Sequence, residues 1–148
     1  TIMFGLSGSV GGKITAAPPN YAPHTAPISV DLGGTAAAST GIGGTWTGVT
    51  TVVGSGNSTD TLTGTGQTYS LTAATPNAGS NGSVGWTGIE NLTDATGTIM
   101  FGLSGSVGGN ITAATLNYTT PAWANSVGAA VPISGASRAW ASPSSATS

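Results

Sequence analysis

The sequence predicts an all-β protein wound as a parallel β-solenoid with glycine-rich turns, with a β-sandwich as the alternative architecture. Three observations lead to this prediction. Short stretches alternate apolar and polar residues with a period of two, and β-branched residues are abundant while strong helix formers other than Ala are scarce. Glycine-rich steps separate the stretches. No stretch repeats apolar residues at helical spacing over three capped turns.

The predicted strands follow the period-two pattern. Residues 28–32, 69–72 and 101–103 alternate in this way. Gly-Gly and Asn-Gly steps between strands are expected to supply turns with positive φ, at Gly11-Gly12, Gly33-Gly34, Gly43-Gly44, Asn81-Gly82 and Gly108-Gly109. At roughly 20–25 residues per coil, we expect about six or seven coils and a rod about 30 Å long.

The chain contains an internal repeat. Residues 1–21 recur at 98–118, identical except for the pairs Lys13/Asn110, Pro18/Thr115 and Pro19/Leu116. A fainter copy relates residues 46–49 to residues 86–89. Such self-similarity predicts a tandem array. We therefore divide the chain into a repetitive β-solenoid over residues 1–118 and an irregular Ala/Ser/Pro-rich segment over residues 119–148, which would be a cap, an arm or a linker.

Composition excludes several classes of function. Gly, Thr, Ala and Ser make up about 60% of the 148 residues, and the chain has two basic and four acidic residues with a net charge of −2. Two cations cannot neutralise a phosphate backbone, which excludes nucleic acid as a partner. The absence of Cys excludes disulfides and Cys-based metal sites. No apolar run approaches the ~20 residues of a membrane span, and the uncharged, Thr/Ser-rich composition favours an extracellular or cell-surface location.

Several segments carry a family resemblance: residues 46–57, 60–64, 85–92 and 101–111. Here the chain resembles the repeat regions of large bacterial surface proteins, the filamentous-haemagglutinin-like adhesins and related β-helical repeat proteins. The resemblance covers most of residues 1–118 and weakens beyond. It implies a parallel β-helix, secretion, and a mechanical or adhesive role without catalysis. Because that family has no fixed catalytic set, the resemblance assigns no functional residue.

The titratable residues do not form a pattern that predicts catalysis, a cofactor or a metal site. Glu90 and Asp94 are the only carboxylates close in sequence, and we interpret them as a solvated pair at a turn. Asp31 and Asp60 are isolated and are expected to cap turns. His24 has no second His or Cys with which to share a metal. We therefore predict a protein that is not an enzyme.

Aromatic and Asn residues give the remaining candidate sites. Trp46 and Trp86 occupy matching positions of the fainter repeat and are interpreted as core residues, with sugar stacking as the alternative. Candidate glycosylation acceptors are the five Asn residues of Asn-x-Ser/Thr sequences, Asn57, Asn81, Asn91, Asn110 and Asn117.

These observations favour a non-catalytic structural subunit that assembles with itself into an extracellular fibre, tube or sheath. The ends of a solenoid expose unpaired backbone groups, and the chain starts directly with an apolar strand without a charged cap. The residues expected at the interface between subunits are Thr1, Ile2, Met3, Phe4, Leu6, Trp123 and Trp140. The alternative is a repeat segment of a giant cell-surface adhesin that binds glycans or host surfaces.

Overall fold

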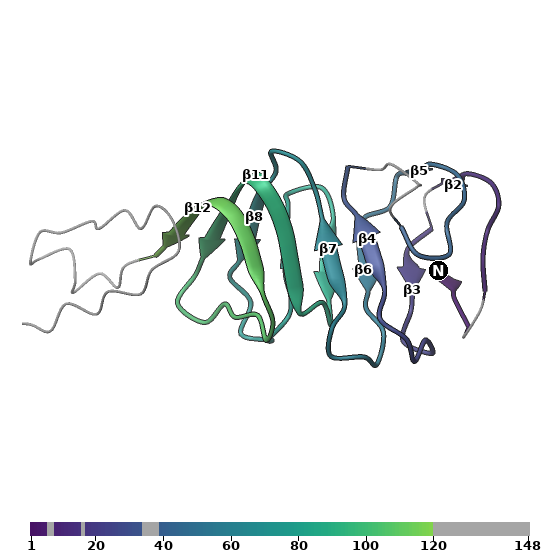
Figure 1. Ribbon diagram of the computed structural model, residues 1–148, viewed down its shortest axis with the longest axis horizontal. Coiled ribbons are helices and arrows are strands. Elements are labelled where there is room, and N and C mark those ends of the chain that lie inside the picture. The colour runs from purple at the N-terminus through teal and green to yellow at the C-terminus, as the bar shows by residue number, and fades with distance from the viewer. Residues whose placement is uncertain (6–7, 16, 34–38, 120–148) are drawn as a thin grey trace, which may run out of the picture.

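The computed structural model describes residues 1–5, 8–15, 17–33 and 39–119. These residues form an elongated, curled β-structure built from short strands and turns (Figure 1). The all-β prediction is confirmed, because the described residues contain strands and no helix. It follows that none of them forms a helix able to cross a membrane. Leu6, Trp123 and Trp140 lie outside the described residues, as does the predicted C-terminal segment after Thr119.

Most strands are only two to four residues long, and β11 and β12 are the long exceptions. Two predicted strands are found within a residue or two of their expected bounds, as β4 and β8, whereas the predicted strand at 101–103 is only the end of β11. The strands are β1 (Ile2–Met3), β2 (Ile14–Thr15), β3 (Pro19–Asn20), β4 (Ser29–Asp31), β5 (Trp46–Thr47), β6 (Thr51–Val53), β7 (Thr61–Thr63), β8 (Thr68–Leu71), β9 (Gly79–Ser80), β10 (Gly85–Thr87), β11 (Asn91–Phe101) and β12 (Ile111–Tyr118).

The strands form one large sheet and one small one. The ten-stranded sheet follows the order β1-β3-β6-β10-β9-β8-β11-β7-β4, and β12 pairs with β11. β2 and β5 form a separate parallel pair. The large sheet is mixed, because β9 runs antiparallel to both of its neighbours, β8 and β10, while its other described pairings are parallel.

Parallel partners are farther apart in the sequence than predicted. Ile14 pairs with Trp46, 32 residues on, and Thr51 pairs with Gly85, 34 residues on. Of the pairings in the described part of the chain, only β1–β3 and β11–β12 fall below the predicted spacing of 20–25 residues. The predicted spacing was wrong because further short strands lie between parallel partners, as β5 and β6 do between β4 and β7.

The glycine pairs also act differently from the prediction. Among described residues, only the Asn81-Gly82 step has its predicted positive φ, at Gly82 (89°). The other positive-φ glycines include Gly48 and Gly88, both at 67°, which follow Trp-Thr in the fainter repeat. Gly44 instead allows close backbone approach: a Cβ there would lie 2.6 Å from the carbonyl of Gly12.

The core runs through the interior of the curled sheet as rows of apolar side chains in register. Val30 pairs with Leu62, Leu62 with Leu92, and Leu92 with Ile111. The first three of these side chains are at most 1% exposed. Each such burial contributes about 1.5–3 kcal/mol, so these rows hold successive passes of the chain together.

Candidate functional site

The two copies of the 21-residue repeat build the same local structure at the two ends of the molecule. In the first copy β1 pairs with β3 and Ile2 lies opposite Pro19; in the second, the end of β11 pairs with β12 and Ile99 lies opposite Leu116. The registers are therefore equivalent. Both copies also contain a stacked aromatic pair: the ring centroids are 4.7 Å apart in Phe4–Tyr21 and 4.9 Å apart in Phe101–Tyr118. The sequence repeat is thus a structural repeat.

The first copy is covered on the side of β3. β6 pairs with β3 there, and the backbone N–H of Tyr21 donates to the carbonyl of Val53 at 2.9 Å. The Tyr21 hydroxyl donates to the carbonyl of Thr40 at 2.7 Å, and the side chain is fully buried. Burial raises the pKa of Tyr21 to about 12.

The second copy is covered on the opposite side. β8 pairs with the end of β11, placing Tyr69 opposite Ile99, and the backbone N–H of Gly102 donates to the carbonyl of Leu71 at 2.9 Å. Ile99 is fully buried, whereas Tyr118 on the outer strand is 56% exposed. In each copy, therefore, described strands cover one side of the repeat and leave the other side open.

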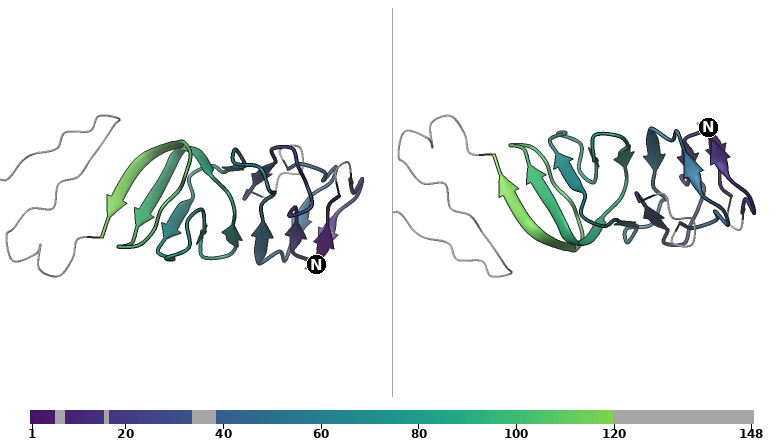
Figure 2. Two further views of the ribbon diagram at one scale, coloured as in Figure 1. Left: turned by 90° about the horizontal axis from the view of Figure 1, so that it is seen from below. Right: turned by 90° about the horizontal axis from the view of Figure 1, so that it is seen from above.

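The open sides lie at opposite ends of the molecule (Figure 2). β1 ends the path of the large sheet on one side, and β12 pairs only with β11 among the described strands. Of the predicted interface residues at the β1 end, Thr1 and Met3 are exposed and Ile2 is half-buried, while Phe4 is 2% exposed and belongs to the core. Sequence reasoning missed β12 as an end strand, although the repeat itself relates it to β3.

The carboxylates hold connections between strands. The Asp31 Oδ1 accepts from the backbone N–H of Gly33 at 2.9 Å, and the Asp60 Oδ1 accepts from the N–H of Ile28 at 3.0 Å. The contact at Asp31 confirms its interpretation as a turn cap. Asp60 is fully buried and binds a backbone group 32 residues away, so it joins two distant segments and its turn-capping interpretation was wrong. Glu90 accepts hydrogen bonds from the Asp60 N–H and the Asn77 side chain, so it links three segments.

Asp94 is buried, at 2% exposure, so its interpretation as part of a solvated pair with Glu90 was wrong. Its carboxylate accepts from the backbone N–H groups of Gly66, Gln67 and Thr96, from the Thr96 hydroxyl and from the Tyr69 hydroxyl. Burial alone would raise the Asp94 pKa, but these hydrogen bonds to the charged form outweigh burial and hold the pKa below its usual value. Burial is the largest cause of the raised pKa of Tyr69, and the hydrogen bond to the Asp94 carboxylate raises it further.

His24 is 8% exposed, and its Nδ1 lies 3.2 Å from the carbonyl of Ala26. Its ring packs edge-on against Tyr21. In the described part of the chain, His, Asp and Glu side chains do not gather in groups of three or more that could hold a metal ion. The described carboxylates and His24 are thus arranged to satisfy backbone groups and to pack.

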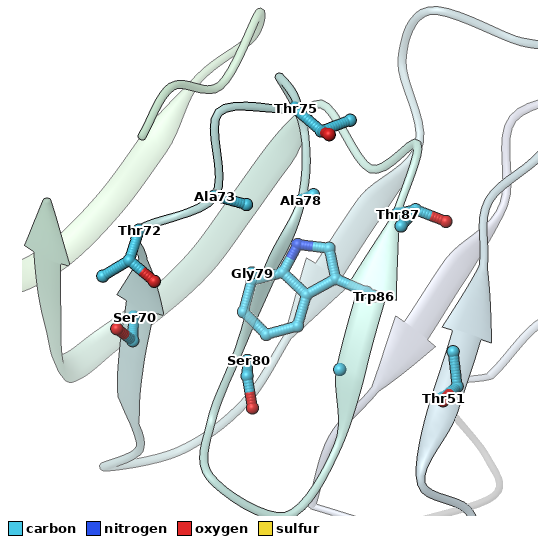
Figure 3. Close-up of a pocket in the computed structure, with 11 residues that line it drawn as sticks. Thr51, Ser70, Thr72, Ala73, Thr75, Ala78, Gly79, Ser80, Trp86 and Thr87 are labelled. Atoms are coloured by element: carbon cyan, nitrogen blue, oxygen red, sulfur yellow. The ribbon is translucent and has the colours of Figure 1, made fainter. Parts of the chain in front are cut away.

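A groove of about 430 Å³ lies over Trp86 and is lined mainly by small and hydroxyl-bearing residues, including Ser70, Thr72, Ser80 and Thr87 (Figure 3). Trp86 and Trp46 are 2% and 7% exposed, which confirms their interpretation as core residues. Among described side chains, the Nε1 atoms of both are buried without a hydrogen-bond partner. Because Trp86 is buried, its ring is not open for a sugar to stack on.

The candidate glycosylation acceptors differ in accessibility. Three donate their side-chain amide within the protein: Asn57 to the carbonyl of Thr25, Asn81 to the Gln67 side chain, and Asn91 to the carbonyl of Asp60. Asn110 and Asn117 are exposed on or beside β12.

Comparison with family models, with curated proteins and with solved structures finds no match to this chain. The arrangement with the clearest functional meaning is the pair of open strand edges at the two ends. Backbone N–H and C=O groups on such edges can pair with another strand.

Proposed function

We propose that the protein is a non-catalytic structural subunit of an extracellular fibre, tube or sheath, in which a solenoid-like β-stack continues from one molecule to the next. The observation that carries the proposal is the structural repeat. The same motif lies at both ends in the same register, and no described strand pairs with the outer side of β1 in one copy or of β12 in the other.

The chemistry of the surface supports this proposal. With two basic and four acidic residues in 148, charge repulsion between subunits is weak. Large apolar side chains are exposed in and beside the two copies of the repeat: Met3, Met100, Leu103 and Tyr118. The regular spacing of 30–34 residues between most parallel partners supports a solenoid-like continuation, because each circuit presents a similar edge to the next.

Sedimentation velocity over a range of protein concentrations, with negative-stain imaging of the same samples, tests the proposal. We expect the mean mass to rise well above the 14.1 kDa of one chain and the images to show elongated particles. A single species of monomer mass at every concentration would contradict self-assembly.

A repeat segment of a longer cell-surface adhesin is a second candidate, favoured by the equivalent structural positions of residues 1–21 and 98–118. In a tandem array, each added repeat covers the open edge of the one before. A chain lengthened by a second copy of residues 22–118 should then unfold at a higher temperature than the original chain, as in other repeat proteins. An unchanged melting temperature would argue against the array.

A further inference from the structure

We infer that the outer edge of β12 binds β1 of a second copy in parallel, head to tail, with Leu116 opposite Ile2, Asn117 opposite Met3 and Tyr118 opposite Phe4. This inference rests on the proposed self-assembly and specifies the surface and the register through which it would occur.

The chain itself shows that both kinds of edge accept a parallel strand. β3, which is equivalent to the end of β12, pairs with β6 on its outer side. The end of β11, which is equivalent to β1, pairs with β8 on its outer side. The open edges of β12 and β1 therefore have the same sequence type and local geometry as edges that are already paired within the molecule.

The direction of the strands permits the same contact between molecules. β8 and β10 are both antiparallel to β9, so they run in the same direction, and the remaining pairings of the large sheet are parallel. β12 and β1 therefore point the same way along the sheet. Because they lie at opposite ends of the long axis (Figure 1), a second copy displaced along that axis brings its β1 beside β12 without reversal.

The side chains match in this register. Leu116 and Ile2 are both half-buried and would form one inward row, as Ile99 and Leu116 already do. Phe4 is buried in its own molecule, so the β1 side of the junction consists of the β1 backbone with Ile2 and Met3. On the β12 side, Tyr118 supplies an exposed aromatic ring. Neither strand carries a charged side chain, and no like charges would oppose each other.

Opposite charges placed at Met3 and Asn117 test the register, because both residues are exposed in the single molecule and would face each other only across the junction. The double variant Met3→Lys/Asn117→Lys should associate about three- to fivefold more weakly at low salt than Met3→Lys/Asn117→Glu, the range expected for cross-strand charge pairs. High salt should reduce the difference. Matched control variants carry the same charges at the exposed Thr47 and Thr87, away from both edges, and should associate equally.

Sedimentation of the parent chain and of the four variants separates the outcomes. A parent chain that stays monomeric contradicts the proposed function as well. A parent that associates, with equal association of the two Met3/Asn117 variants, overturns the β12–β1 junction alone and leaves self-assembly through another surface. Equal melting temperatures of all variants in the monomeric state would show that the charges act between molecules and not on folding.

Discussion

The two copies of the repeat have nearly the same sequence and the same strand register, yet they bury different residues. Tyr21 is fully buried and its equivalent Tyr118 is 56% exposed, whereas Ile99 is fully buried and its equivalent Ile2 is only half-buried. The difference follows from the neighbours, since β6 covers the first copy and β8 covers the second. The motif thus determines local pairing, and adjacent strands determine how much each residue contributes to stability.

Tyrosine truncation should show the largest contrast. We expect Tyr21→Ala to lower the free energy of unfolding by about 3–5 kcal/mol, because it empties a fully buried site and removes the hydrogen bond to Thr40. Tyr118→Ala should cost less than about 1 kcal/mol, because its side chain is mostly exposed. Denaturant unfolding followed by circular dichroism measures both values. Equal losses would mean that the two copies have equivalent surroundings.

Alanine at equivalent glycines should give the next largest contrast. A Cβ at Gly105 would overlap the carbonyl of Leu71, whereas at Gly8 its nearest neighbour is the nitrogen of Gly5 at 3.2 Å. Gly105→Ala should therefore destabilise the fold by about 1–3 kcal/mol, and Gly8→Ala by less. Thermal melting of the two variants makes the comparison, and a larger effect at Gly8 would refute this account of the packing.

Removal of a single methyl group should again cost more in the second copy than in the first. Ile99→Val should cost about 0.5–1.5 kcal/mol, and Ile2→Val only a fraction of that, because no described strand pairs with β1 on its outer side. Chemical denaturation in the monomeric concentration range measures the difference. If association covers β1, the cost of Ile2→Val should increase with protein concentration.

Alkaline pH should report on the burial of the Tyr21 phenol in the first copy. The folded-state pKa of Tyr21, about 12, lies above the unfolded value near 10, so its contribution to stability is complete below pH ~10 and is lost as the pH rises from there through about 12. Tyr21→Phe should weaken this loss, and absorbance titration of the phenols should show one fewer late-titrating group. An unchanged titration curve would mean that Tyr21 is not one of the buried phenols.

Part of this structure could be predicted from the sequence. The period-two stretches around Val30 and Tyr69 predicted strands, and the repeated residues predicted a structural repeat. These features depend on neighbours close in the chain. The burial of Asp94 could not be predicted, because its hydrogen-bond donors at Gly66 and Gln67 lie nearly thirty residues away and are brought close only by the pairing of β8 with β11.

The strands at the two ends also show how far the sequence alone can predict the structure. Residues 98–118 were recognised as a copy of residues 1–21, but the copy says nothing about which side of it is covered. The antiparallel β9 was also missed, since Gly79 and Ser80 form a strand too short for a period-two pattern to reveal.

Every strand of the large sheet except β9 points the same way. The two ends of the long axis differ from each other, because the edge of β1 lies at one end and the edge of β12 lies at the other (Figure 1). A filament built by adding such molecules in line would have two different ends, and subunits would add to the two ends at different rates. A head-to-tail contact that does not close into a ring sets no number of subunits, so the filament length would depend on the protein concentration and on any ligand that covers an end.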